Sequence, residues 1–221
     1  MNINKINPST LKITDMRFAD IDGAPKRCTL MKLYTNQGLV GYGEVRDASS
    51  RTYAAMLKSR ILGENPCNVE KIFRRIKQFG GDSRQAGGVC AIELACWDIA
   101  GKYYKVPVYR LLGGGFRTEI PAYCSVLMPG TEQEIKELVE SKAYANFRGF
   151  KFGWGALGES PKKDIQLVEL ARKYVGDDKD LMIDIAMRWR DCKTAVKMVR
   201  AFEDYNLKWL EEPFTPDNVE G

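Results

Sequence analysis

The sequence predicts an α+β domain over residues 1–118, followed by a partial (βα)8 barrel of the TIM type over residues 119–221 with about four strands. Short alternating segments separated by turn residues fill the first part, whereas strand-like and helix-like segments alternate in the second. Three apolar runs of the second part lead to Lys151, Asp184 and Glu211, which are 33 and 27 residues apart. A (βα)8 barrel uses about 31 residues for each strand and helix and carries its chemistry at the carboxyl ends of its strands.

The first part is predicted to be an antiparallel meander followed by helices. Apolar and polar residues alternate in the expected strands, and turn-forming residues separate them. These strands are residues 11–19, 28–35 and 39–45. The expected helices are residues 53–62, 68–79 and 89–104. The last of them is apolar around most of its circumference, which predicts a buried helix.

The second part alternates four strands with three helices. The expected strands are residues 120–126, 147–151, 181–184 and 207–211, and the expected helices are residues 131–144, 161–174 and 192–205. Thr131 and Glu134 have the spacing of a capping box at the start of the first helix. An open doubly wound sheet has the same local pattern, but it usually carries a glycine-rich nucleotide loop, and residues 128–131 do not match one.

The chain continues for only ten residues beyond Glu211, so we expect an incomplete barrel. Half a barrel leaves two strand edges and an apolar inner face uncovered, and such surfaces favour association. Two interpretations follow. The chain is the first part of an enzyme whose remainder lies elsewhere, or it is a catalytically inactive, truncated fragment that needs a partner to complete the barrel.

Composition and charge exclude several classes of protein. The 34 basic and 29 acidic residues give a formal net charge of +5, but they are mixed along the chain, so we expect no nucleic-acid binding. No stretch approaches the roughly 18 apolar residues of a membrane span. The first five residues carry no apolar signal segment, and we expect a soluble cytoplasmic protein without membrane contact.

Cysteine spacing and the absence of histidine limit the chemistry further. The six cysteines form no C-x-x-C pair, and without histidine they predict no zinc site and no disulfide framework. A Ser-His-Asp triad and a Cys-His pair are likewise impossible within this chain. Proton transfer must therefore use lysine, a carboxylate, tyrosine or a residue supplied from elsewhere.

Asp184 and Glu211 are predicted to be metal ligands. Two carboxylates at neighbouring strand ends repel each other unless a positive charge lies between them, and hard oxygen ligands select Mg²⁺, or Mn²⁺, over zinc and copper. The alternative is that the two acids cap helices or pair with Lys151 and Arg188. Their spacing of one barrel unit favours the metal site.

Lys151 is the candidate catalytic residue. Beside a metal and inside an apolar mouth, its ammonium form would be disfavoured, which makes it a candidate acid or base at neutral pH. Its alternative role is to neutralise Asp184. We expect Glu212 to point to the other side of the sheet if the strand continues to that position.

Residues 91–102 (AIELACWDIAGK), 106–114 (VPVYRLLGG) and 209–213 (WLEEP) resemble motifs of the enolase superfamily, in its mandelate racemase and muconate lactonising branch. The predicted order of an α+β domain before a barrel is similar as well. The resemblance spans essentially the whole chain. It implies that the first part is the capping domain of that superfamily.

The resemblance implies magnesium-assisted removal of the proton α to a carboxylate, which gives an enediolate held by the metal. It also implies that Asp184 and Glu211 are the first two of three metal ligands, and that Lys151 is the first lysine of a Lys-x-Lys motif near the substrate and the base. The partner would be a small-molecule carboxylate substrate. In the full-length form we expect a homo-oligomer.

Two departures from the family pattern narrow the reaction. Gly153 replaces the second lysine of the motif, and Ala186 replaces the asparagine often found after the aspartate. Both favour dehydration of an aldonic or aldaric sugar acid to a 2-keto-3-deoxy acid, with a histidine from a later strand as the base. A racemase, epimerase or cycloisomerase of the same superfamily is the alternative.

The resemblance implies that the choice of substrate depends on two loops of the capping domain, here residues 19–27 and 46–53, together with later barrel loops. Lys26, Arg46 and Arg51 lie in these loops and could meet an acidic or polyhydroxylated substrate. Solvation at the surface is the alternative role of each.

Overall fold

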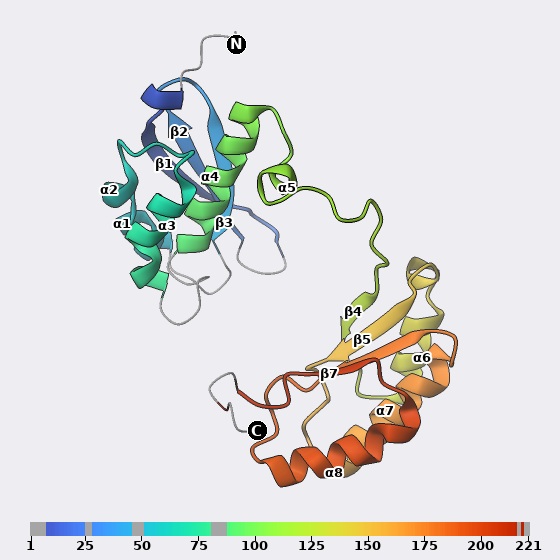
Figure 1. Ribbon diagram of the computed structural model, residues 1–221. Helices are drawn as coiled ribbons and strands as arrows, with labels where there is room; N and C mark the ends of the chain where they lie inside the picture. The colour runs from blue at the N-terminus through green and yellow to red at the C-terminus, as the bar shows by residue number, and fades with distance from the viewer. Residues whose placement is uncertain (1–7, 25–27, 46–50, 81–87, 216–217, 219–221) are drawn as a thin grey trace. The chain divides into compact units, whose positions relative to one another are not determined.

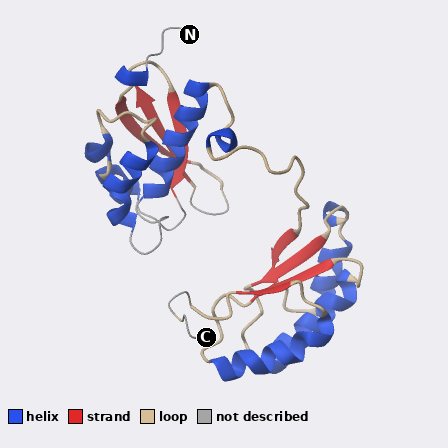
Figure 2. Ribbon diagram, in the orientation of Figure 1, coloured by secondary structure: helices blue, strands red, loops and turns tan. Residues whose placement is uncertain are grey.

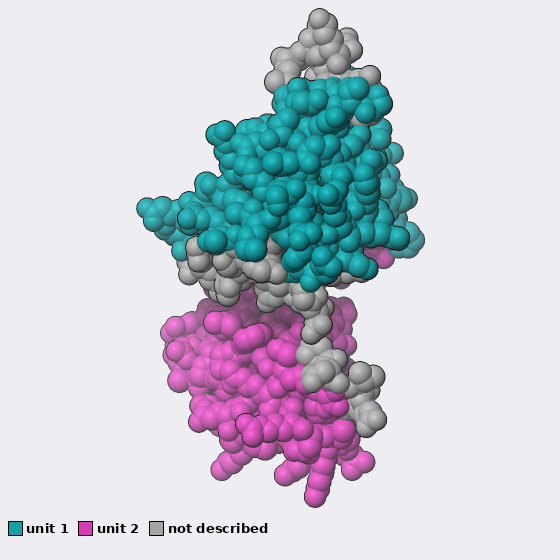
Figure 3. Space-filling view, turned by 90° about the vertical axis from the view of Figure 1, so that its left-hand side faces the viewer, with its two compact units in different colours: residues 1–116 teal, residues 117–221 magenta. Residues whose placement is uncertain are grey.

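The structure is a computed structural model that describes residues 8–24, 28–45, 51–80, 88–215 and 218. The chain divides into two compact units, Met1–Phe116 and Arg117–Gly221 (Figure 3). The sequence predicted a boundary between residues 118 and 119. Each unit has a hydrophobic core of its own, and each is described separately here.

An antiparallel meander forms the sheet of the first unit. Its strands are β1 (Ile13–Asp20), β2 (Thr29–Thr35) and β3 (Val40–Val45), in the order β1-β2-β3, and a short 3-10 turn, η2 (Pro8–Thr10), precedes them. Met31 lies opposite Phe18 of β1 and opposite Gly43 of β3. The meander predicted from the alternation of apolar and polar residues is therefore confirmed.

Helices cover one face of this sheet (Figures 1 and 2). They are α1 (Arg51–Met56), α2 (Lys58–Ile61), α3 (Val69–Ile76) with η3 (Lys77–Gly80), and α4 (Val89–Tyr104), and the short α5 (Val108–Leu111) follows beside the end of α4. The single helix predicted over residues 53–62 is thus two short helices. The long buried helix is confirmed as α4, whose backbone packs directly on β3. A Cβ at Gly43 would lie 2.0 Å from the carbonyl oxygen of Ala91, so glycine is required there.

Side chains of α4 also bind the outer edge of β3. Asp98 Oδ2 accepts a hydrogen bond from the amide of Tyr42 at 2.9 Å, and Lys102 Nζ donates to the carbonyl oxygen of Val40 at 2.8 Å. The two side chains form an ion pair with each other at 2.6 Å. The helix thus supplies hydrogen-bond partners that a further strand would otherwise provide.

Four parallel strands form the sheet of the second unit. They are β4 (Cys124–Leu127), β5 (Gly149–Gly153), β6 (Asp180–Asp184) and β7 (Trp209–Glu211), in the order β4-β5-β6-β7. The connecting helices are α6 (Glu132–Glu140), α7 (Pro161–Val175) and α8 (Cys192–Phe202), with short 3-10 turns η5 (Lys142–Tyr144) and η6 (Glu203–Tyr205). All three helices lie on one side of the sheet (Figure 1). The predicted succession of parallel crossover units is confirmed.

Alternation along the strands separates two faces of this sheet. Phe150, Phe152, Leu181 and Ile183 are buried in the core beneath the helices. The opposite face, called the inner face below, carries two rows of side chains that the parallel register aligns. One row is Ser125, Lys151, Met182 and Trp209, and the next is Leu127, Gly153, Asp184 and Glu211.

The prediction that Lys151 ends its strand is wrong. The strand was predicted at residues 147–151, but β5 spans Gly149–Gly153, so Lys151 is its middle residue. The apolar Phe147 belongs to the preceding turn, because its amide donates a hydrogen bond to the carbonyl of Tyr144 at 3.2 Å. Asp184 and Glu211 do end their strands, as predicted.

Candidate active site

The structure brings together the three residues predicted to form the site. Asp184 and Glu211 are register partners at the carboxyl ends of β6 and β7. Lys151 Nζ lies 2.8 Å from Glu211 Oε1, 3.0 Å from Glu211 Oε2 and 3.6 Å from Asp184 Oδ2. The lysine and aspartate side chains are 15% and 8% exposed, whereas that of Glu211 is 34% exposed, so solvent reaches the group from the side of the glutamate.

Lys151 has a raised pKa among these side chains, whereas the expectation of a disfavoured ammonium form concerned a lysine beside a bound metal and stays a prediction. Burial favours the neutral amine and lowers the pKa, but the hydrogen bond to Glu211 and the charges of Glu211 and Asp184 outweigh it. The residue is therefore the ammonium partner of two carboxylates. This is the neutralising role that the sequence left open as the alternative.

The carboxylate of Glu211 has donors on two strands. Its pKa is lowered, first by the hydrogen bond from Lys151 and further by one from the indole of Trp209, while burial opposes the shift. The Trp209 Nε1 to Glu211 Oε2 distance is 3.1 Å. Sequence reasoning missed this tryptophan as a site residue. Its position two residues before Glu211 on the same face of β7 was the available signal.

Asp184 lies over Gly153 of the neighbouring strand. A Cβ at position 153 would lie 2.7 Å from Asp184 Cβ and 3.1 Å from its Cγ. Asp184 Oδ1 also accepts a hydrogen bond from the amide of Ala186 at 2.9 Å. The two positions where this chain departs from the family motif, Gly153 and Ala186, therefore both contact the aspartate.

Left-handed backbone follows each of the strands β5, β6 and β7. The φ angle is +55° at Trp154, +57° at Ala186, +60° at Met187 and +47° at Glu212. Residues other than glycine rarely adopt this region, and each instance costs on the order of 1 kcal/mol or more. The strand β7 ends at Glu211 and the exposed Glu212 lies in this turn, so the condition under which Glu212 was expected to point to the other side of the sheet is not met.

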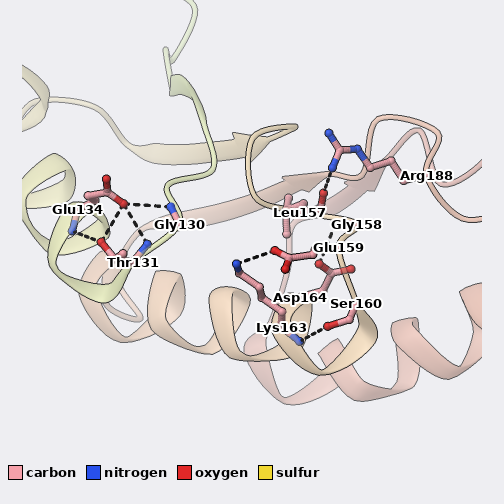
Figure 4. A network of polar contacts seen from close by, with 10 residues as sticks. All are labelled: Gly130, Thr131, Glu134, Leu157, Gly158, Glu159, Ser160, Lys163, Asp164 and Arg188. Carbon is pink, nitrogen blue, oxygen red and sulfur yellow. Dashed lines mark hydrogen bonds and ion pairs between the residues drawn. The ribbon is translucent and has the colours of Figure 1, made fainter.

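The loops after β5 and β6 are joined at this end of the sheet. Figure 4 shows Arg188, in the loop after β6, donating to the carbonyl oxygen of Leu157 in the loop after β5. The buried Asp164, in the first turn of α7, accepts a hydrogen bond from the amide of Gly158 at 2.8 Å. Burial raises the pKa of Asp164 despite this bond. Arg188, one of the predicted alternative partners of the acids, instead binds a neighbouring loop.

The capping box at the start of α6 borders the same end of the sheet (Figure 4). Thr131 Oγ1 accepts from the amide of Glu134 at 3.3 Å, and the Glu134 carboxylate accepts from the amides of Thr131 and Gly130 at 3.0 and 3.1 Å. This confirms the predicted capping box. It begins the helix directly after the loop that leaves β4.

The donor set suits a hard divalent cation in part. Asp184 and Glu211 present carboxylate oxygens from adjacent strands, which is the ligand chemistry of Mg²⁺. Among the residues that the structure describes, no group of three or more histidine, cysteine, aspartate or glutamate side chains could hold a metal ion. Within the described residues, a cation at this site would have two carboxylate ligands, Asp184 and Glu211.

The loops of the first unit that were expected to contact substrate are described in part. Arg51 forms an ion pair with Asp20 at 3.0 Å, which favours the alternative of a surface role. Lys26 and Arg46 lie outside the described residues. In the described part of the chain, no helix has both the length and the apolar character needed to cross a bilayer.

Two family models match the chain on either side of the boundary between the units. Residues 14–113 match the N-terminal domain of the mandelate racemase and muconate lactonizing enzyme family, and residues 132–221 match the enolase C-terminal domain-like family. The chain belongs to the enolase superfamily. Within this superfamily it falls in the mandelate racemase and muconate lactonising branch, as its sequence motifs predicted.

Relatives in the branch differ in the reaction that their names state. The chain is 29% identical over 203 residues to the N-succinyl-L-Arg/Lys racemase of Bacillus cereus, covering 86% of this chain and 53% of the relative. It is 28% identical to the D-xylonate dehydratase of Haloferax volcanii, covering 94% and 55%. The chain thus spans about half the length of these curated relatives.

A solved structure of the superfamily has the same fold. The dipeptide epimerase of Enterococcus faecalis matches with a TM-score of 0.79 and 26% sequence identity, over 96% of this chain and 62% of the epimerase. The order of an antiparallel-sheet domain followed by parallel strands and helices is therefore that of a known enzyme architecture.

Proposed function

We propose that this chain provides the first part of a magnesium-dependent active site that removes the proton α to a carboxylate. The most favoured reaction is dehydration of an aldonic or aldaric acid to a 2-keto-3-deoxy acid. The observation that carries the proposal is the contact of Lys151 Nζ with Glu211 at 2.8 Å and Asp184 at 3.6 Å, at the carboxyl ends of adjacent strands. Barrel enzymes carry their chemistry at this end.

Asp184 and Glu211 would hold the cation, and Mn²⁺ could replace Mg²⁺. When bound, the cation supplies a preplaced positive charge for the carboxylate oxygens of the substrate, whose negative charge grows as the α-proton leaves. Lys151 adds a second positive charge beside the same carboxylate oxygens. The hydrogen bond from Ala186 orients Asp184, and that from Trp209 contacts Glu211.

Dehydration is favoured over racemisation because of position 153. Racemisation by opposed bases would use a second lysine there, and this chain has Gly153, with Asp184 lying over it. Curated relatives named as dehydratases of xylonate, arabinonate and galactonate support this choice. Relatives named as a racemase, an epimerase and a cycloisomerase make those reactions the alternative.

Metal binding tests the site itself. Mn²⁺ titrations followed by electron paramagnetic resonance should show weak binding to the purified chain, because two carboxylates are a partial ligand set, and none to Asp184→Asn or Glu211→Gln. Asp180→Asn is the matched control, since Asp180 is on the same strand but pairs with Lys208. Equal binding by the wild type and both site variants would contradict the proposal.

The reaction is tested by joining residues 1–221 to the part of the Haloferax volcanii D-xylonate dehydratase that this chain does not match. The chimera should convert members of a panel of aldonic and aldaric acids to 2-keto acids, and Asp184→Asn should abolish the conversion. Inversion at the α-carbon without loss of water, followed by NMR in D₂O, would instead support the racemase and epimerase alternative.

A further inference from the structure

Trp209 contacts the site from the last described strand of the sheet. It lies on the inner face of β7, in register with Met182 of β6, and Glu211 follows it two residues later on the same face. An indole can donate a hydrogen bond but cannot accept one. A carboxylate oxygen is a suitable acceptor, and the part-buried Glu211 Oε2 provides it at 3.1 Å.

The glutamate is thereby held by two donors of different kinds. Lys151 of β5 contacts both oxygens of Glu211, at 2.8 and 3.0 Å. Trp209, two residues before Glu211 on β7, contacts Oε2. A cation bound by Glu211 would compete with the ammonium group for the same oxygens. The neutral indole N–H carries no charge that opposes the cation, so its bond is compatible with binding.

An aromatic contact fixes the indole in turn. The ring of Tyr123, which precedes β4, meets the ring of Trp209 edge to face, with 5.5 Å between centroids and an angle of 76°. Tyr123 precedes one edge strand of the four-stranded sheet and Trp209 lies on the other edge strand, so the contact spans the inner face. Such edge-to-face pairs restrict the orientation of both rings.

We propose that Trp209 is a positioning residue that holds the carboxylate of Glu211 in its inward orientation, independently of Lys151. This inference rests on the proposed function for its consequence, because the held carboxylate is the proposed metal ligand. Groups that orient metal ligands in this way typically change metal affinity about 10- to 100-fold when removed.

The first test is spectroscopic and needs no metal. In ¹⁵N–¹H spectra, the indole signal of Trp209 is identified by its loss in Trp209→Phe. That signal should shift in Glu211→Gln, and the same shift should persist when Lys151→Met is introduced beforehand. The indole signal of Trp154, whose side chain is exposed, should stay in place in all of these variants.

The second test measures Mn²⁺ binding by electron paramagnetic resonance. Trp209→Phe keeps an aromatic ring against Tyr123 but removes the N–H, and it should weaken binding about 10-fold or more. Trp154→Phe is the matched control and should change binding less than about twofold. Circular dichroism of both variants establishes that each is folded.

An unmoved Trp209 signal in Glu211→Gln, or a shift that disappears in the Lys151→Met background, would overturn the inference. A Trp209→Phe chain that binds Mn²⁺ as well as Trp154→Phe would also overturn it. If the wild-type chain binds no Mn²⁺ while the indole shift occurs as expected, the metal proposal fails, and the positioning of Glu211 by Trp209 stands.

Discussion

Individual residues at the strand ends pack so closely that even small substitutions should change the stability of the chain. Gly153 and Asp184 illustrate this, since the aspartate occupies the space into which a side chain at position 153 would project. Introducing the lysine of the family motif at this position would therefore require Asp184 to move. The present position of Asp184, the proposed metal ligand, is therefore compatible with glycine at position 153 and not with the lysine of the motif.

Gly153→Ala should destabilise the chain by about 1–3 kcal/mol, because the new methyl group would displace Asp184 from its present rotamer. Urea denaturation measures the loss. Gly130→Ala is the control, since a Cβ there meets its nearest neighbour at an ordinary 3.9 Å. Equal stability of the two variants would show that Asp184 is free to move away.

Asp15 should make the stability of the first unit depend on pH. Its pKa is lowered by hydrogen bonds from Lys58 and Arg17, so the folded state favours the carboxylate. This stabilisation is present above the unfolded pKa of about 4 and is lost as the pH falls through the lowered folded value. Chemical denaturation of Asp15→Asn and wild type should differ at pH 7 and converge at low pH. Asp22→Asn, in the loop after β1, is the control, and a pH-independent difference for Asp15→Asn would contradict this prediction.

At the scale of secondary-structure elements, the turns after the barrel strands store backbone strain. Ala186 is the clearest case because it has φ of +57° while its amide binds the carboxylate of Asp184. Any residue except proline at position 186 could donate this backbone hydrogen bond to Asp184. The conformation itself favours glycine.

Ala186→Gly should therefore stabilise the chain, by about 1 kcal/mol, although glycine for alanine is destabilising in a helix. Ala201→Gly within α8 is the opposing control and should cost about 0.5–1 kcal/mol. Thermal denaturation of the two variants should shift the midpoint in opposite directions. A lower midpoint for Ala186→Gly would contradict the assignment of strain.

Arg172 of α7 connects the elements at the other end of the strands. Its guanidinium donates to the carbonyl oxygens of Gly176 and Lys179 ahead of β6, and of Tyr205 and Asn206 ahead of β7, at 2.7–3.0 Å. Burial lowers its pKa. Four carbonyl groups at two turns thus depend on one planar side chain.

Arg172→Lys should cost about 2 kcal/mol, because an ammonium group cannot reach the two turns together. Arg200→Lys on the exposed face of α8 is the matched control and should stay within about 0.5 kcal/mol of wild type. Hydrogen exchange would localise the effect, with the amides near residues 176–180 and 205–208 exchanging faster in Arg172→Lys alone. An exchange rate raised equally along the whole of α7 in Arg172→Lys, and not only at the two turns, would argue against a local role.

Most elements could be predicted from the sequence because hydrophobic periodicity and capping are local signals. The capping box at Thr131, the buried α4 and the strands ending at Asp184 and Glu211 are examples. The displacement of β5 by two residues could not be predicted, since Phe147 is apolar but its amide is used by a turn. The hydrophobicity of a segment does not indicate which of its backbone amides pair with a neighbouring strand and which are used in a turn.

At the scale of the whole molecule, the chain consists of two units with separate cores. The first core combines β-strand residues such as Met31 and Leu33 with α4 residues such as Ile92 and Ile99. All members of this core lie between residues 11 and 99. The second core draws only on residues 124–202.

A fragment of residues 1–116 should therefore fold by itself, with a cooperative urea transition, because it contains every member of its core. A fragment of residues 1–88 is the control, since it lacks α4 and should show no such transition. Circular dichroism follows both. Absence of a cooperative transition in the longer fragment would show that the first unit requires the rest of the chain.

The position of the candidate site could be predicted from the sequence, but its internal arrangement could not. The spacing by barrel units predicted that Asp184 and Glu211 lie at one end of one sheet, because parallel strands share a direction, and Lys151 reaches them from the middle of β5. The sign of the pKa shift of Lys151 depends on how close the carboxylates approach, and the role of Trp209 depends on a hydrogen bond across two residues. Both are three-dimensional quantities that no motif states.

The side chains of Asp98 and Lys102 on the edge of β3 have a consequence for aggregation. An unprotected edge strand is a template for extended segments of other chains, and this is how amyloid and strand-swapped assemblies begin. In this protein the amide of Tyr42 and the carbonyl of Val40 already have partners from α4. Addition of a strand at β3 would first have to break those two hydrogen bonds, so α4 opposes fibril growth from this edge.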